Sequence, residues 1–314
     1  MLVMLAVALV AFAMFRHVGD PVASLVGQDT PPEVRAQMRR DLGLEDPVVM
    51  QFAAYVGRAV RGEFGISYRE GRKVSSLIAE KLPATIELSI VAALFALGAG
   101  IPMGVYSGLR PRSALARLFQ IVSLVGISLP TFLIGIILIL VFGVLLKWLP
   151  TFGRGDVTAL GWWSTGFLSW SGIKAVILPA VTLGLFQMTL IMRLVRAEML
   201  EVLRADFVKF ARARGLTDRA VHFGHALRST LVPVITVTGL QLGAIIAFAI
   251  ITETVFQWPG LGFMFLQSVQ RADIPVMSTY LVLIGLLFVL INLVVDLLYF
   301  AVDPRIRLDR PARG

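Results

Sequence analysis

The chain of 314 residues contains no cysteine and only three histidines. The absence of cysteine excludes disulfides, thiol catalysis and any metal site built on thiolates. Charged residues make up only 16% of the chain, hydrophobic residues make up 57%, and the mean hydropathy is +0.82. These proportions exclude a disordered chain and are typical of a protein that crosses a membrane several times.

The sequence also lacks the patterns that nucleotide binding and catalysis require. No G-x-x-x-x-G-K-[ST] segment occurs, so this chain does not supply a Walker-type nucleotide site itself. His222 and His225 lie three residues apart without an H-E-x-x-H pattern or a third ligand, so we expect neither a metal site nor a cofactor. No nucleophile–base pair or pair of carboxylates stands out, so we predict no catalytic residues and no enzyme activity.

Long apolar runs dominate the chain. A membrane-spanning helix needs about 20 mostly apolar residues. We predict an all-α polytopic protein with about six such helices, in which Pro130 interrupts the third. The first run is read as a membrane helix because no basic region precedes it and no A-x-A site follows, as a signal peptide would require. The six runs are residues 1–16, 84–106, 116–146, 175–197, 231–252 and 277–301.

The distribution of Lys and Arg predicts the orientation. The formal net charge of +9 does not indicate a nucleic-acid partner, because the basic residues are scattered over loops without an aromatic platform. Short loops that are rich in Lys and Arg face the cytoplasm, which applies to residues 110–117 and 193–228. We therefore expect an external segment at 17–83, with an amphipathic helix from Glu33 to Leu42. The five-helix core at 84–301 would include a cytoplasmic loop at 198–230, and residues 302–314 would form a cytoplasmic tail.

The loop from Asp206 to Pro233 is a polar, Arg-rich island between two apolar runs. Phe207, Phe210, Ala211 and Arg214 fall at helical spacing, which predicts a short helix with both Phe and Ala211 on one side. Gly215 is expected to end this helix, and Thr217 with Asp218 to cap a second helix that runs through Val221. Ala211 and Gly215 would then form a small-residue face for another protein.

This island resembles a known coupling loop. ARARGLT (211–217) and HALRSTLVP (225–233) are similar to the loop of bacterial ABC importer permeases, in the first-permease branch of the dipeptide, oligopeptide and nickel family. Lys209 stands where the broader family has an acid, and Arg228 where it has a proline. The resemblance extends in order through SLPTF (128–132), LPAVTLG (178–184), VFQWPGLG (255–262), RADIP (271–275) and NLVVDLLYFAVDPRIR (292–307).

The resemblance implies a type I importer permease of the MetI-like fold in a bacterial inner membrane. It implies as partners a second homologous permease, two ATP-binding subunits and an external substrate-binding protein. In that family the loop docks into a cleft on the ATPase. The residues expected to make this contact are Phe207, Phe210, Ala211, Arg212, Ala213, Arg214, Gly215, Leu216, Thr217, Asp218 and Val221.

Several assignments stay open on the sequence. Peptides are the expected cargo, whereas nickel complexes, glutathione and haem are alternatives on the same scaffold. A secondary transporter is a further alternative, but it would need ionisable residues central in the bilayer. The external segment either binds the substrate-binding protein or only covers the outer mouth.

Polar residues inside the apolar runs either line a translocation path or join helices by hydrogen bonds. These residues are Glu87, Ser128, Gln187, Gln241 and Asn292. Trp258, in the WPGLG turn, is expected to anchor the chain at the membrane interface. A re-entrant element at the outer mouth is the alternative for that turn.

Overall fold

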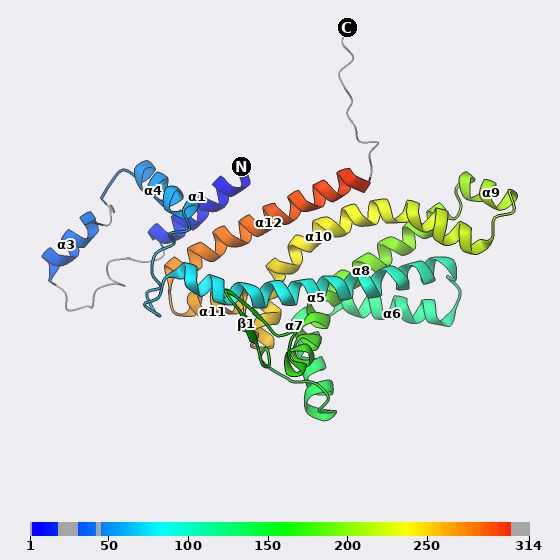
Figure 1. The fold of residues 1–314 in the computed structure, drawn as a ribbon, viewed down its shortest axis with the longest axis horizontal. Coiled ribbons are helices and arrows are strands. Elements are labelled where there is room, and N and C mark those ends of the chain that lie inside the picture. Colours follow the sequence, from blue (N-terminus) through cyan, green and yellow to red (C-terminus); the bar gives the residue numbers. More distant parts are fainter. Residues whose placement is uncertain (1, 18–30, 42–44, 303–314) are drawn as a thin grey trace, which may run out of the picture. The chain divides into compact units, whose positions relative to one another are not determined.

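The computed structural model describes residues 2–17, 31–41 and 45–302, and these are mostly helical (Figure 1). The all-α prediction is therefore confirmed, with one small antiparallel hairpin added. The elements are α1 (Leu2–His17), α3 (Pro32–Asp41), α4 (Val48–Val60), α5 (Val74–Leu109), α6 (Ala114–Ser128), α7 (Thr131–Leu138), the π-helical η1 (Ile139–Leu145), β1 (Thr158–Leu160), β2 (Trp163–Thr165), α8 (Trp170–Val202), α9 (Asp206–Ala213), the π-helical η2 (Ala220–Ala226), α10 (Leu227–Val255), α11 (Leu261–Gln270) and α12 (Ile274–Val302).

Three helices in the described part of the chain are long and apolar enough to cross a membrane, namely α5, α8 and α12. The count becomes four if the bent pair of α6 with α7 and η1 forms one span. The shorter apolar helices Leu2–Met14 and Gly243–Val255 overlap the first and fifth runs expected from the sequence. The total of six spans stays a prediction.

The third run is broken where the sequence predicts. Helix α6 ends at Ser128, and Pro130 precedes the first residue of α7. The two helices are bent by 114° at this break. Proline lacks the backbone N–H that would continue the helical hydrogen bonds, and its ring disfavours a helical conformation in the residue before it.

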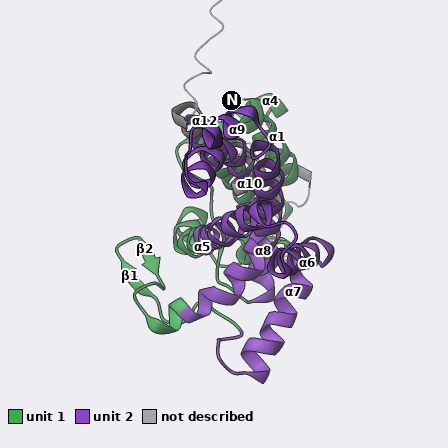
Figure 2. Cartoon of the chain, turned by 90° about the vertical axis from the view of Figure 1, so that its right-hand side faces the viewer, with its two compact units in different colours: residues 1–87, 152–173, 257–289 green, residues 88–151, 174–256, 290–314 purple. Residues whose placement is uncertain are grey.

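By its contacts the chain divides into two compact units (Figure 2). The first comprises Met1–Glu87, Phe152–Ile173 and Gln257–Val289, and the second comprises Leu88–Thr151, Lys174–Phe256 and Leu290–Gly314. Each unit has its own apolar core.

The core of the second unit depends on small residues in α5. Ala92, Ala96, Gly100, Gly104 and Gly108 recur at every fourth position, so they share one helix face. A Cβ atom added at Gly104 would lie 2.7 Å from the Met192 carbonyl oxygen of α8. The backbones of α5 and α8 thus approach closely, as small residues permit in membrane helix pairs.

The core of the first unit joins the start of α5 to α11 and α12. Val74 and Leu77 of α5 are buried with Leu261 of α11 and Val276 of α12. Helices α1 and α4 also meet in this unit, where the rings of Phe12 and Phe52 lie 5.5 Å apart. A helix is confirmed in the stretch 33–42, as α3, whereas its amphipathic character stays a prediction. Leu42 and the tail at 303–314 lie outside the described residues.

Candidate functional site

The candidate coupling loop folds as a helix, a tight turn and a second helical segment. Helix α9 begins at Asp206 and ends at Ala213. Two residues later, Gly215 has a φ of +79°. The Gly215 N–H donates to the Arg212 carbonyl at 2.9 Å, and the Leu216 N–H to the Ala211 carbonyl at 3.3 Å. These bonds close the C-terminus of α9 in the left-handed conformation that glycine adopts most readily.

The segment after the turn starts as predicted but does not end as predicted. The Thr217 hydroxyl accepts a hydrogen bond from the Ala220 N–H at 3.4 Å, and the Thr217 carbonyl one from the Val221 N–H at 3.0 Å. Thr217 therefore caps a new helical turn. That turn continues as η2 directly into α10, so the second segment is the beginning of a long helix and no separate short helix ends near Val221.

The inner side of the loop is a small apolar cluster. Val208 and Ala211 of α9 are buried against Val221 of η2, with Val202 of α8 packed on them. The predicted face that joined both Phe to Ala211 is thus wrong. Ala211 points inward because Val208 and Ala211 together meet Val221, so this small residue is not available to another protein.

The outer side of the loop exposes large apolar side chains. Phe210 is 64% exposed, Phe207 45% and Leu216 40%, and Phe223 of η2 is exposed as well. The remaining residues expected at the ATPase contact are exposed too, namely Arg212, Ala213, Arg214, Gly215, Thr217 and Asp218. Of the residues expected at the ATPase contact, only Ala211 and Val221 are buried. That the exposed ones contact an ATPase stays a prediction.

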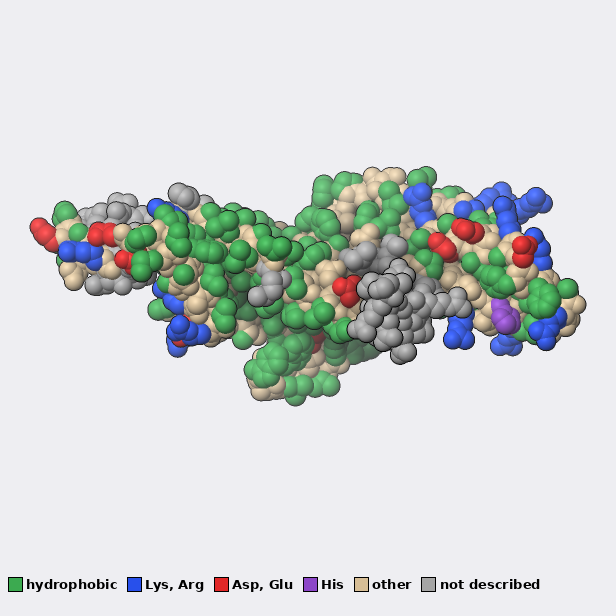
Figure 3. All heavy atoms as spheres, turned by 90° about the horizontal axis from the view of Figure 1, so that it is seen from above, with side chains coloured by type: hydrophobic (Ala, Val, Ile, Leu, Met, Phe, Trp, Pro, Cys, Tyr) green, Lys and Arg blue, Asp and Glu red, His purple; other side chains and the backbone are tan. Residues whose placement is uncertain are grey.

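Charged side chains surround this apolar surface. The Lys209 ammonium lies 2.8 Å from the Asp206 carboxylate, and the Arg214 guanidinium lies over the Phe210 ring, 5.7 Å from its centroid. The Asp218 carboxylate oxygen Oδ1 lies 3.9 Å from Arg212 Nε and 4.0 Å from His222 Nε2. Lys and Arg side chains gather around α9 in the second unit, together with Asp, Glu and His, at the right of Figure 3. Among the described residues no group of three or more His, Cys, Asp or Glu is placed to hold a metal ion.

The residues predicted to line a path lie in different surroundings. Gln187 of α8 is buried, its side-chain amide donates to the Gln241 carbonyl of α10 at 3.5 Å, and its Oε1 has no partner among the described residues. Gln241 and Asn292 are half-buried, and Ser128 is exposed at the end of α6. Gln187 and Gln241 thus lie in contact within the second unit.

Glu87 forms a buried ion pair that the sequence did not indicate. The Arg154 guanidinium lies 2.6 Å from its carboxylate, and their side chains are 7% and 5% exposed. Trp163 Nε1 donates to the same carboxylate at 3.3 Å, and Arg154 also donates to the Ser164 carbonyl at 2.6 Å. Through these hydrogen bonds Glu87 joins the β1–β2 hairpin to α5. The two charges are 67 positions apart in the chain, so no local pattern could have paired them.

The WPGLG turn corrects the assignment of Trp258. Trp258 is 1% exposed, and its indole N–H donates to the Ala84 carbonyl of α5 at 2.9 Å. The Leu261 N–H donates to the Thr85 hydroxyl at 2.8 Å. Trp258 is therefore a core residue of the first unit and no interfacial anchor. The ten-residue helix α11 follows this turn.

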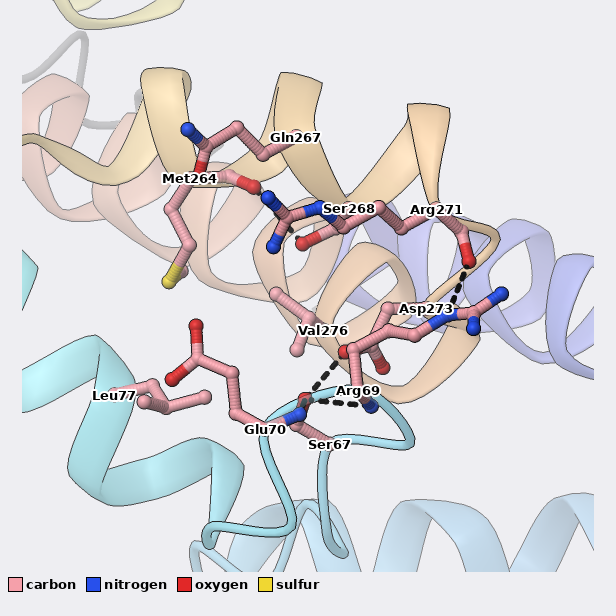
Figure 4. Close-up of a pocket in the computed structure, with 10 residues that line it drawn as sticks. All are labelled: Ser67, Arg69, Glu70, Leu77, Met264, Gln267, Ser268, Arg271, Asp273 and Val276. Atoms are coloured by element: carbon pink, nitrogen blue, oxygen red, sulfur yellow. Dashed lines mark hydrogen bonds between the residues drawn. The ribbon is translucent and has the colours of Figure 1, made fainter. Parts of the chain in front are cut away.

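A buried carboxylate also fixes the loop at Ser67 and Tyr68, in the segment that is expected to be external. Asp273 is 3% exposed, and it accepts hydrogen bonds from the Ser67 hydroxyl and, at 3.2 Å, from the Tyr68 N–H. The Arg69 guanidinium donates to the Arg271 carbonyl at 2.8 Å. Beside these contacts lies a small polar hollow, into which Glu70 points from the loop (Figure 4). Sequence reasoning missed this contact, as it missed the fully buried Glu253 of α10.

The matching family models and the similar proteins all indicate the membrane component of a transport system. Residues 100–308 match the family described as "Binding-protein-dependent transport system inner membrane component", and residues 1–89 match its N-terminal counterpart. The di/tripeptide transport system permease protein DppB of Pseudomonas aeruginosa is 40% identical, over 97% of this chain and 95% of that protein. The oligopeptide transport system permease protein AppB of Bacillus subtilis is 37% identical, over 97% and 95%.

A solved structure shows the same fold at lower identity. A chain of the MetNI methionine ABC transporter in an inward-facing conformation superposes with a TM-score of 0.57 at 20% identity, covering 72% of this chain and 96% of that one. The relatives are permease subunits and not enzymes, and the ATPase of such systems is a separate subunit. The chain belongs to the family of binding-protein-dependent transport system inner membrane components, the membrane-embedded permease subunits of ABC transporters.

Proposed function

We propose that this chain is one of two homologous permease subunits of an ATP-driven importer for short peptides in a bacterial inner membrane. Two ATP-binding subunits and an external substrate-binding protein would complete the assembly. The relatives that transport di- and tripeptides in Pseudomonas and oligopeptides in Bacillus support peptides as the cargo. Their similarity covers almost the whole chain, so the proposal does not rest on the loop alone.

The observation that carries the coupling role is a folded loop with exposed aromatic rings. Its inner cluster of Val208, Ala211 and Val221 keeps the loop in shape, while Phe210 and Phe207 remain in contact with water. Burying one such side chain stabilises a complex by roughly 1.5–3 kcal/mol. A partner that covers both rings would therefore gain substantially, and exposed apolar patches of this kind typically mark interaction sites.

The loop is joined on both sides to long helices of the second unit. Three residues separate the end of α8 from α9, and η2 continues into α10. A movement of the loop, driven by closure of the ATPase subunits, would displace both helices. The proposed mechanism is alternating access, in which nucleotide and cargo favour one of two arrangements by differential contact.

Replacement of Gly215 by Leu tests the coupling role. Gly215 has a φ of +79°, so a leucine at this position strains the backbone. No atom lies within 4 Å of an added Cβ, so the bulky side chain would enter the proposed docking surface without an internal clash. We expect loss of ATP-dependent uptake and of co-purification with the ATPase, with normal membrane insertion.

Gly62 supplies the matched control. It has a φ of +76° and equally open space around its Cβ, but it lies in the external segment. Gly62→Leu imposes the same kind of strain and should retain both uptake and ATPase association. Normal uptake by Gly215→Leu, or equal loss in both variants, would contradict the proposed contact.

The cargo requires a separate measurement. The assembled transporter and its binding protein in proteoliposomes should take up a labelled dipeptide or longer peptide on addition of ATP. Competition by unlabelled peptide, glutathione, a nickel chelate or haem identifies the cargo class. Uptake that requires an ion gradient and not ATP would favour a secondary transporter.

A further inference from the structure

Residues 157–173, which comprise the β1–β2 hairpin and the first turn of α8, contain no charged side chain. Three tryptophans occur in this stretch, at positions 162, 163 and 170. An external loop that contacts only water normally carries charged residues. This composition instead matches the boundary between lipid and water, where tryptophan is enriched.

The apolar side chains of this stretch face outward. Trp162 is 71% exposed, Trp170 70% and Leu168 66%. Leu160 and Phe167 are also exposed. Contiguous exposure of this kind marks a surface that something else covers.

The exposure does not arise from a lack of structure. Arg154 fixes the hairpin to the buried Glu87, and its guanidinium donates to the Ser164 hydroxyl at 3.0 Å. Across the strands, Thr158 pairs with Thr165 and Leu160 with Trp163. The hairpin that carries Trp162 is thus an ordered element joined to α5.

The lipid bilayer is the covering surface that the chain itself indicates. Trp170 is the first residue of α8, which is long and apolar enough to span a membrane. Ile173, three positions later on the same helix face, is exposed too, so the apolar patch continues onto the membrane-facing side of a spanning helix. The polar side chains within residues 157–173 are hydroxyls only, such as Thr158 and Ser169, and these suit a headgroup boundary.

We propose that the β1–β2 hairpin is an interfacial membrane anchor, with Trp162 and Leu168 inserted at the boundary between lipid headgroups and acyl chains. The buried pair of Glu87 and Arg154 then connects this anchor to α5. The anchor goes beyond the transport role, and it does not depend on which cargo is carried.

Spin labels on single cysteines test the anchor, and the chain has no native cysteine to remove. Trp162→Cys and Leu168→Cys report on the hairpin, and Glu63→Cys, exposed in the external segment, is the control. The transporter is reconstituted into lipid nanodiscs without its binding protein. Collision of each label with oxygen, which concentrates in lipid, is compared with collision with a water-soluble nickel chelate.

We expect both hairpin labels to collide severalfold more with oxygen than with the chelate, and the label at 63 to show the reverse. Addition of the binding protein should leave the hairpin labels unchanged. Three results would overturn the anchor. They are an aqueous pattern like that at 63, low collision with both reagents as a protein cover would give, and a change caused by the binding protein.

Discussion

The carboxylate of Glu87 and the guanidinium of Arg154 lie 2.6 Å apart with almost no contact to solvent. A buried charge that loses its partner typically destabilises a protein by about 3–5 kcal/mol. We therefore expect Glu87→Gln or Arg154→Met alone to lower the melting temperature of the purified protein clearly. The double variant should be less destabilised than the sum of the single variants, because it leaves no charge unpaired. Additive losses in thermal unfolding would argue against the pair.

Because α5 and α8 approach closely, replacing two glycines of α5 by alanine should affect the melting temperature very differently. A Cβ at Gly104 would lie 2.6 Å from the Val195 Cβ, whereas a Cβ at Gly98 meets nothing within 4 Å. Gly104→Ala should lower the melting temperature because the helices must separate. Gly98→Ala should be neutral or stabilising by up to about 1 kcal/mol, since alanine favours helix. Equal behaviour of the two variants in a thermal shift assay would refute the packing argument.

Replacement of Asp273 should loosen the loop around Ser67 and Tyr68. Asp273→Ala removes the acceptor of the Ser67 hydroxyl and the Tyr68 N–H, at a local cost of about 1–3 kcal/mol. Backbone amides of residues 66–73 should then exchange hydrogen faster, as measured by mass spectrometry. Exchange in α8 should not change. The exposed Glu63 supplies the control, because Glu63→Ala removes a carboxylate without a described role in this contact.

A variant of Gln187 can show whether this residue only packs the helices or also lines the transport path. Its Oε1 is buried without a partner in the described part of the chain, so Gln187→Leu removes an unsatisfied polar atom. We expect the melting temperature to rise or stay equal. If Gln187 also contacts cargo, uptake falls in the same variant although its stability does not. Unchanged uptake together with raised stability would assign Gln187 to helix packing only.

Local signals in the sequence predicted the elements whose geometry is decided by near neighbours. Gly215 closes α9 because glycine adopts a positive φ, and Pro130 separates α6 from α7 because it cannot continue a helix. Thr217 caps the next turn as its type and position indicate. Such signals act within about one helical turn, so they can be read from a single sequence.

Predictions failed where distant partners decide. Spacing alone could not show that Ala211 meets Val221, or that Trp258 has a hydrogen-bond acceptor at Ala84. Trp is suited both to membrane interfaces and to buried sites with an acceptor, and only the tertiary structure distinguishes them. The every-fourth repeat from Ala92 to Gly108 was visible in the sequence. Its meaning required knowledge that α8 lies on that face.

The length of α8 means that, in the proposed mechanism, the ATPase would bind at a distance from the membrane-embedded part of the transport path. Its 33 residues correspond to about 50 Å of helix, against about 30 Å for the hydrocarbon core of a bilayer. Roughly 20 Å of helix therefore extends past the acyl chains, which accommodates its charged last turns near Arg196 and Glu201. If an ATPase binds the loop at this end, as proposed, its contact lies in water, and salt and pH would act on that contact without acting directly on the part of the path inside the hydrocarbon.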